Sequence, residues 1–402
     1  MRSVVLLFAL MIACLIAKTV QVAGRVELLS GAPSDVAADQ QLGSAVTRLN
    51  QQFRKEWQDE SVQMASPTDD LTVLRRLSLA LFGTVPSLED IRAFEDDSGP
   101  DRIDRWVTKM LQDSRYSDYF SERLARSLVG VEGGPFIVFR RDRLKSWLAE
   151  QLHKDASWSQ MTKELIAAEG LWTDRPAANF ITVARIDDKG LDENKLAGRT
   201  VRTFLGQRID CAQCHDHPFD PEWQQADFEG LAAYFCQATL SPGGVTDDTS
   251  RHKPMVYKVT DPGTEVERIV ASAVPFQPEL LPEHGGPRAR LAEWVTHKDN
   301  RRFERSIANR VWGFMFGKPL HEPVDDLPHP IEGQTDPLDI LGQEFRSRGD
   351  RLSVLIRIIA QSDVFRLSSK SIADNEDSYT EQVNAWSVFP LVRLRPEQVI
   401  GS

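Results

Sequence analysis

Seven prolines between residues 239 and 287 limit what this chain can fold into. Proline lacks a backbone N–H group and breaks the interior of a helix, so no long helix can run through this stretch. Pro242 with Gly243 and Gly244 adds a turn signal. Residues 255–259 are rich in residues that favour β-structure, and they predict one arm of a small β-hairpin. We therefore expect a linker with a hairpin at residues 241–287, separating two regions.

On both sides of this linker, apolar residues recur at helical spacing. Before it, the pattern includes Leu74, Leu77 and Leu81, with Ser87 as the N-cap of the helix that follows. After it, the pattern returns at residues 303–316 and again at residues 353–361. The sequence therefore predicts a mainly α fold, with one helical domain at residues 67–240 and a second at residues 288–402.

The N-terminus carries a targeting segment. Residues 4–17 form an almost unbroken apolar run that follows Arg2 and ends at Lys18. This run is too short for a membrane span but suits the apolar core of a signal peptide. Residues 1–24 are therefore expected to be a signal peptide or an uncleaved N-terminal anchor. Residues 11–14 also loosely resemble a lipoprotein box, in which Cys14 would carry the lipid.

Each of these alternatives puts the bulk of the chain outside the cytoplasm, in the periplasm or another extracytoplasmic space. Membrane association is expected only through the N-terminal segment. Residues 25–66 are polar, with apolar residues at helical spacing, and they predict a polar helical stalk or a helix laid against the first domain.

Composition excludes one class of partner and makes the cysteines informative. The formal net charge of −11 leaves no large basic surface, so nucleic-acid binding is not expected. Outside the N-terminal segment the chain has Cys211, Cys214 and Cys236, and an odd number suits a disulfide framework poorly. Cys236 lies in an apolar helical stretch and is expected to be a buried thiol.

The most informative motif is formed by Cys211, Cys214 and His215, which spell C-x-x-C-H. This spacing is typical of the covalent attachment of a c-type haem. Two thiols about one helical turn apart can reach the two vinyl groups on one side of a porphyrin, and the adjacent imidazole can then ligate the iron. Because His217 is only two residues away, we expect it outside this coordination, near the cofactor or on a second metal.

Two other interpretations use the same residues. Cys211, Cys214, His215 and His217 together could hold zinc or iron without haem, since thiolate and imidazole are ligands that these metals accept. Alternatively, the two cysteines could form a disulfide in an oxidising compartment. The cofactor is thus expected to be c-type haem, with zinc or iron as the alternative.

A second axial ligand, if haem has one, would come from elsewhere in the chain. Downstream of the motif the candidates are His252 and Met255, and upstream they are His153 and Met161. The alternative for each is a purely structural role, either exposed to solvent or packed in the core. A five-coordinate haem would favour the binding of small ligands or peroxide chemistry.

Another group of charged residues lies near the C-terminal half of the chain. Arg310 precedes Asp325 and Asp326, with His321 and His329 on either side of the two carboxylates. The structural interpretation is an ion pair from Arg310 to Asp325 or Asp326 that locks a loop to a helix. The functional interpretation makes the two aspartates metal or sugar ligands, or an acid–base pair.

The order of these motifs resembles that of exported planctomycete proteins that join a planctomycetal cytochrome-type domain to a second, planctomycete-specific domain. The matching residues in the first domain are 75–87, 204–220 and 228–235, and those in the second are 291–295, 309–312 and 316–326. The resemblance covers about residues 70 to 402 and implies cytochrome-like character without a known reaction. Such second domains usually run beyond the equivalent of residues 394–400, so this one is expected to be truncated.

Three functions follow as expectations. The first is an exported cytochrome-like protein that binds c-type haem for redox chemistry or electron transfer. The second is a non-haem metal site with a structural or hydrolytic role, and the third is an exported scaffold or binding module associated with carbohydrate. The expected partner is an extracytoplasmic redox protein or a polysaccharide-processing protein.

Overall fold

Helices account for most of the residues that the structure, a computed structural model, describes: 42–131, 139–186, 190–221, 223–247, 255–260, 265–331, 333–370 and 376–402. The expected mainly α fold is confirmed. The described residues belong to one compact unit, Asp39–Ser402. The signal-peptide or anchor segment at residues 1–24 and the candidate ligand His252 lie outside the described residues.

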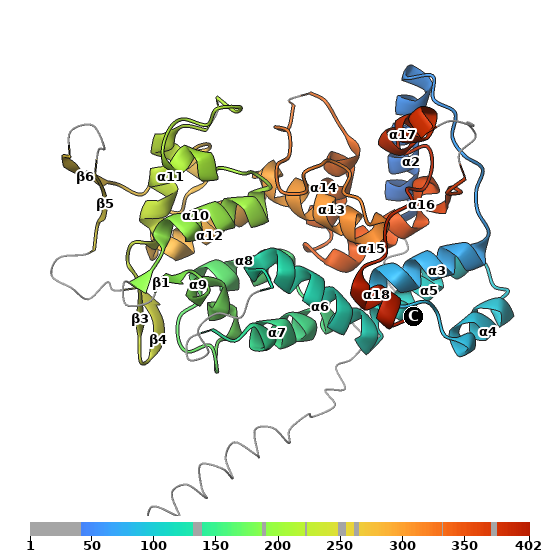
Figure 1. Ribbon diagram of the computed structural model, residues 1–402, viewed down its shortest axis with the longest axis horizontal. Helices are drawn as coiled ribbons and strands as arrows, with labels where there is room; N and C mark the ends of the chain where they lie inside the picture. The colour runs from blue at the N-terminus through green and yellow to red at the C-terminus, as the bar shows by residue number, and fades with distance from the viewer. Residues whose placement is uncertain are drawn as a thin grey trace, which may run out of the picture. The chain divides into compact units, whose positions relative to one another are not determined.

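The helices before the linker follow the apolar spacing of the sequence (Figure 1). They are α2 (Leu42–Asp59), α3 (Asp70–Leu81), α4 (Leu88–Asp96), α5 (Arg102–Leu111), α6 (Ser114–Val129), α7 (Arg141–His153), α8 (Trp158–Ala167), α9 (Asn179–Thr182), α10 (Glu193–Thr200) and α11 (Gln225–Ala232). As expected, Ser87 caps α4 by accepting a hydrogen bond from the Asp90 N–H group at 3.1 Å.

The helices after the linker are α12 (Pro287–Thr296), α13 (Arg301–Phe316), α14 (Pro337–Ser347), α15 (Leu352–Gln361), α16 (Asp363–Arg366), α17 (Glu376–Asn384) and α18 (Pro396–Ile400). Helix α13 is buried on nearly all sides and packs against α14, α15 and α3. Its Trp312 stacks on Phe316 at 4.5 Å between ring centroids and meets Trp386 edge to face at 5.2 Å. This aromatic cluster forms the centre of the core around α13.

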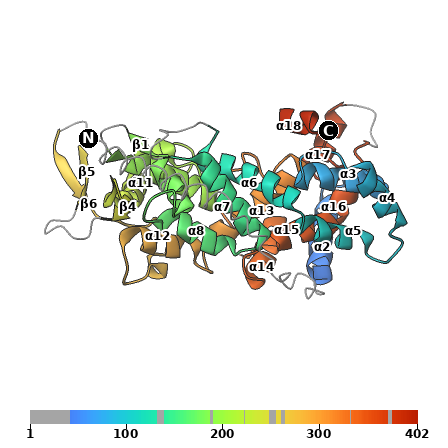
Figure 2. The ribbon, with the colours of Figure 1, turned by 90° about the horizontal axis from the view of Figure 1, so that it is seen from below.

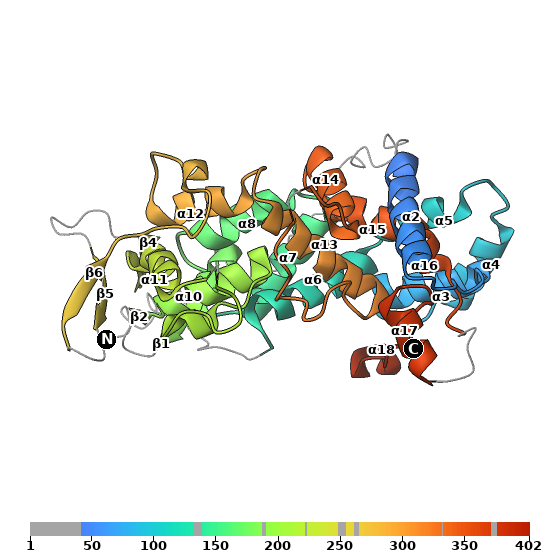
Figure 3. The same cartoon turned by 90° about the horizontal axis from the view of Figure 1, so that it is seen from above.

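Residues 42–59, expected to be part of a polar helical stalk or of a helix laid against the first domain, form the packed helix α2. Figure 3 shows α2 beside α15 and α16, and it also contacts α14. Its apolar face is buried, and Phe53 lies 5.7 Å from the Trp312 ring. The polar residues that suggested a stalk occupy the exposed face of an amphipathic helix.

Three antiparallel pairs of short strands complete the described structure. They are β1 (Arg185–Ile186) with β2 (Gly190–Leu191), β3 (Ala238–Ser241) with β4 (Gly244–Asp247), and β5 (Tyr257–Thr260) with β6 (Glu267–Val270). The pair β5–β6 confirms the hairpin predicted from residues 255–259, and Figure 1 shows it extending away from the helices. The sequence analysis missed the other two pairs, because strands of two to four residues leave little periodicity to detect.

Helices from both sides of residues 241–287 share one hydrophobic core. Figure 2 shows α12, which follows this segment, alongside α8, which precedes it. Arg288 strengthens the contact: it pairs with Asp247 at 2.6 Å and donates a hydrogen bond to the Ile166 carbonyl at 3.1 Å. The chain therefore returns to its first helices after the proline-rich stretch.

Candidate functional site

The Cys-His segment, residues 208–220, begins with a single 3₁₀ helix at Asp210–Gln213. In a 3₁₀ helix, residues three apart lie on the same face. Ile209 and Ala212 are fully buried and hold the turn against the protein, whereas Cys211 and Cys214 are exposed. Both thiols are therefore open to solvent, Cys211 on the helix and Cys214 at its C-cap.

The chain reaches this segment through a wide turn. After α10, residues Val201–Leu205 continue as a π-helical turn that ends at Gly206 with φ of 64°. A Cβ atom at Gly206 would lie 2.9 Å from Cδ1 of Leu327, and the Leu327 N–H group donates to the Gly206 carbonyl at 2.7 Å. Glycine is therefore required here by both its backbone conformation and its close neighbour.

The far side of the segment is fixed to the start of α11. Oδ1 of Asp216 accepts a hydrogen bond from the Gln225 N–H group at 2.9 Å. A carboxylate at this end of a helix satisfies a free N–H group and interacts favourably with the helix dipole. His217 donates its backbone N–H group to the carbonyl of the buried Trp223 at 2.9 Å. The loop between the motif and α11 is thus anchored at two points.

The cysteines differ in environment. Cys211 and Cys214 are exposed and carry free thiols, so the structure contains no disulfide between them. Cys236 is buried, as expected, and its Sγ lies 3.5 Å from the Met255 carbonyl oxygen. Burial raises the pKa of the Cys236 thiol, which makes it less reactive than an exposed thiol.

The two histidines of the segment present different ring nitrogens. Nδ1 of His215 lies 2.6 Å from the Asp216 carbonyl oxygen, which can only accept, so Nδ1 carries the hydrogen. In the neutral ring, Nε2 of His215 then has a free lone pair. In contrast, Nδ1 of His217 accepts the Phe219 N–H group at 3.4 Å. The neutral His217 ring therefore carries its hydrogen on Nε2.

This difference has a chemical consequence. Histidine ligands of metals commonly donate one ring N–H group to a carbonyl and bind the metal with the other nitrogen. His215 has this arrangement, whereas the Nε2 atom of neutral His217 is a donor. Within the described residues, no three His, Cys, Asp or Glu side chains converge in a way that could hold a metal ion. Cys211, Cys214, His215 and His217 are thus close in sequence without surrounding a common point.

The other described ligand candidates differ in exposure. Met161 is buried, with 2% of its surface exposed, and Met255 is partly exposed. His153 is exposed on α7. Among the described residues, no hydrogen bond or ion pair joins these three to the Cys-His segment.

The charged group after α13 is organised differently from the expectation. Asp325 pairs with Arg208 at 2.7 Å, and Oδ1 of Asp326 accepts the Arg208 N–H group at 3.3 Å. The expected ion pair from Arg310 to one of these aspartates is absent, because Arg208 from the Cys-His segment takes that place. His329 instead contacts Asp220, 2.7 Å from Nε2 to Oδ2.

A basic cavity that the sequence analysis did not foresee adjoins the segment. It has a volume of about 530 Å³ and lies between the end of α6, α10 with its π-helical turn, and α13. Its charged lining residues are Arg126, Lys195, Arg199, Arg202, Asp210, Arg310 and Asp325. These side chains come from distant parts of the sequence, so no local motif could predict that they line one cavity.

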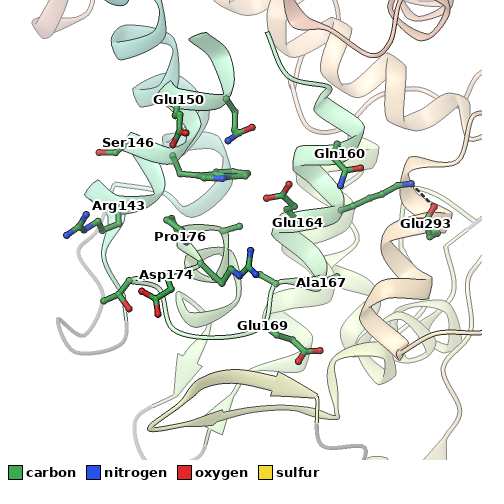
Figure 4. A pocket seen from close by; sticks show the side chains of 17 residues that line it. Arg143, Ser146, Glu150, Gln160, Glu164, Ala167, Glu169, Asp174, Pro176 and Glu293 are labelled. Atoms are coloured by element: carbon green, nitrogen blue, oxygen red, sulfur yellow. Dashed lines mark hydrogen bonds and ion pairs between the residues drawn. The ribbon is translucent and has the colours of Figure 1, made fainter. Parts of the chain in front are cut away.

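A larger cleft of about 1000 Å³ lies between α7 and α8 and is lined mainly by polar side chains (Figure 4). Figure 4 shows Glu150 on α7 and Glu164 on α8, with Glu169 and Asp174 on the connection that follows. At its edge Lys163 pairs with Glu293 at 2.6 Å. The negatively charged side chains outnumber the positively charged ones, so this cleft suits neutral or cationic ligands better than anions.

Two family models match the chain. Residues 48–239 match PSCyt2, described as a protein of unknown function (DUF1549), and residues 287–402 match PSD1, described as a protein of unknown function (DUF1553). The first region contains the Cys-His segment, and the second contains Asp325 and His329. No curated protein and no solved structure matches the chain. No helix among the described residues is long and apolar enough to cross a membrane.

Proposed function

We propose that this chain is an extracytoplasmic cytochrome-like protein in which Cys211 and Cys214 attach a c-type haem and His215 ligates its iron. The observation that carries the proposal is that both thiols, Cys211 on the 3₁₀ helix and Cys214 at its C-cap, are free and exposed. Covalent haem attachment needs two such thiols with an imidazole directly after them.

The tautomer of His215 supports the same assignment. The hydrogen bond from its Nδ1 atom to the Asp216 carbonyl fixes the ring and leaves Nε2 as the free ligand atom. The side chains of Cys211, Cys214 and His215 are all exposed, so a porphyrin can approach them from solvent. The residues present therefore fit the group.

Haem held here would supply a one-electron redox couple at the protein surface. The protein's own contribution is to orient His215 through Asp216 and to hold the thiols through the buried Ile209 and Ala212. The exposed position suits contact with a redox partner. Export would come from residues 1–24, and the partner would be another protein outside the cytoplasm, of redox or polysaccharide-processing type.

The experiment is a pyridine haemochrome spectrum of protein produced with and without the cytochrome c maturation machinery. Wild-type protein produced with the machinery is expected to keep its pigment after extraction with acidified acetone. The double variant Cys211→Ala/Cys214→Ala is expected to lose it. His217→Gln is the matched control, because His217 stays outside the coordination and the pigment should remain.

A non-haem zinc or iron site is the second candidate, supported by the exposed thiols and the free Nε2 atom of His215, although no three such ligands converge among the described residues. It differs from the haem proposal in its need for His217 as fourth ligand. Colourless protein with one zinc or iron per chain, lost in His217→Gln, would support this candidate and contradict the haem proposal. In that case the His217 ring would have to rotate toward the metal and give up its hydrogen bond with the Phe219 N–H group.

A further inference from the structure

The basic cavity beside the Cys-His segment contains more positive charge than its walls neutralise, although the whole chain has a net charge of −11. Arg202 pairs with Asp210, and Arg126 pairs with Glu122 at 2.8 Å and with Glu397 at 3.2 Å. Asp325, the other acidic lining residue, is engaged by Arg208. Lys195, Arg199 and Arg310 have no carboxylate within 4.0 Å in the part of the chain that the structure describes.

Arg310 is the most informative of these three cations. Only 6% of its surface is exposed, yet its Nε atom has no hydrogen-bond partner among the described residues. Its Nη2 atom donates a hydrogen bond to the Thr203 carbonyl at 3.4 Å. Burial lowers the pKa of Arg310 to about 10, although attraction to Asp325 partly opposes this effect, and the guanidinium stays charged at neutral pH. A buried charge without a direct ion pair costs folding free energy, so proteins rarely keep one without a compensating group.

Arg199, Arg202 and Lys195 reach the same cavity from α10 and the π-helical turn that follows it. Arg199 donates to the Leu128 carbonyl at 3.1 Å, which holds its side chain across the end of α6. Arg202 and Thr203 lie on the π-helical turn, a local widening that is frequent at functional sites. Lys195, one turn earlier on α10, is exposed at the edge of the cavity.

We propose that this cavity binds a tetrahedral oxyanion group, a phosphate or a sulfate ester, carried by a larger molecule. Lys195, Arg199 and Arg310 provide the countercharge, and guanidinium groups match the oxygen geometry of such anions. The volume of about 530 Å³ greatly exceeds that of an inorganic ion, since a water molecule takes up about 30 Å³ of liquid. The remainder of the cavity therefore accommodates the body of the ligand. This inference does not rest on haem attachment.

Binding can be measured by isothermal titration calorimetry on the full chain produced without the cytochrome c maturation machinery. The probes are inorganic phosphate, inorganic sulfate, acetate and chloride at one ionic strength. Saturable binding of phosphate or sulfate is expected, with no saturable binding of acetate or chloride. Glucose 6-phosphate and glucose 6-sulfate then distinguish the two sources of the group, and the better of them is expected to bind more tightly than its inorganic ion.

Variants connect the binding to the cavity. Lys195→Gln and Arg310→Gln are each expected to weaken binding about tenfold or more, as the loss of a charge-assisted hydrogen bond implies. Lys154→Gln is the matched control: Lys154 is an exposed lysine that pairs with Glu150 on α7, away from the cavity. Its affinity should equal that of the wild type. Because Lys195 is exposed, its variant keeps the test valid even if Arg310→Gln fails to fold.

Two outcomes would overturn the inference. One is the absence of saturable phosphate or sulfate binding to the wild-type chain, and the other is an equal effect of Lys195→Gln and Lys154→Gln. Anion binding by Cys211→Ala/Cys214→Ala separates this inference from the proposed function. If that variant lacks haem but retains the wild-type affinity for the anion, the cavity acts independently of the Cys-His segment.

Discussion

His329 and Asp220 connect the two regions matched by different family models, with 2.7 Å between Nε2 and Oδ2. A guanidinium nitrogen of Arg302 meets Nδ1 of His329, and because arginine can only donate, Nδ1 accepts. The neutral His329 ring therefore carries its hydrogen on Nε2 and donates it to the Asp220 carboxylate. Since Asp220 ends the Cys-His segment, this contact fixes the segment to the chain beyond α13.

We expect this contact to stabilise the fold measurably. In a double-mutant cycle of Asp220→Ala and His329→Ala, the coupling free energy should be about 1.5 kcal/mol, the lower end for a hydrogen bond to a charged group because this one is only partly buried. Urea unfolding of the four proteins provides the measurement. Strictly additive effects of the two substitutions would contradict the contact.

The sequence singled out the Cys-His segment because its thiols, imidazoles and carboxylates lie within a few consecutive residues, and the chemistry assigned to them stays a prediction. Helical spacing also predicted most helices, including α13, whose expected range 303–316 compares with Arg301–Phe316 in the structure. The buried thiol of Cys236 followed from its apolar neighbours in the same way. Information of this kind is local, so a single sequence contains it.

The pairing of the charged residues could not be predicted, because it depends on distant elements. Asp325 lies fifteen residues after Arg310, which made that pair the natural expectation, yet its partner Arg208 lies 117 residues earlier. The basic cavity likewise combines the end of α6 with α10 and α13. The tautomers of His215 and His217 depend on backbone atoms whose positions the sequence does not specify.

The three described cysteines should differ in reactivity toward a thiol reagent such as Ellman's reagent. In protein without haem, Cys211 and Cys214 are exposed and should react quickly at neutral pH. Cys236 is buried with a raised pKa and should react only after unfolding. Peptide mapping of the labelled protein identifies the sites. Rapid labelling of Cys236 in the folded protein would contradict its buried position.

His321 should make the protein less stable in acid. Burial lowers the pKa of His321, and the nearby Asp336 only partly opposes this effect. Below about pH 6.5, the usual pKa of histidine, the unfolded chain therefore takes up the proton more readily than the folded chain. Its stability contribution is complete above that pH and is lost as the pH falls toward the lowered value of the folded state.

The measurement compares the wild type with His321→Gln by urea unfolding at about pH 7.5 and about pH 5.5. The wild type should lose more free energy of unfolding on acidification than the variant. The substitution leaves the backbone contact of His321 with Asn309 in place, because that contact uses the main-chain N–H group. An equal loss in the two proteins would show that His321 does not contribute.

Gly244 should not tolerate a side chain. Its φ is 102°, and an added Cβ atom would lie 2.1 Å from the carbonyl carbon of Gly170, with which this hairpin pairs. Gly244→Ala should lower the free energy of unfolding by about 1–3 kcal/mol, as overpacking of a tight contact does. Gly243→Ala is the matched control, since its nearest neighbour is Oγ of Ser241 at 3.5 Å. Equal stability of the two variants would contradict this packing.

The most direct test of the proposed haem attachment is the intact mass of the protein produced with the cytochrome c maturation machinery. We predict the mass of the processed chain plus one haem, with the addition located on the peptide that contains Cys211 and Cys214. Cys211→Ala/Cys214→Ala should have the mass of the chain alone. An unmodified mass for the wild-type protein, with both thiols free to react under conditions in which a control cytochrome c matures, would contradict the proposal.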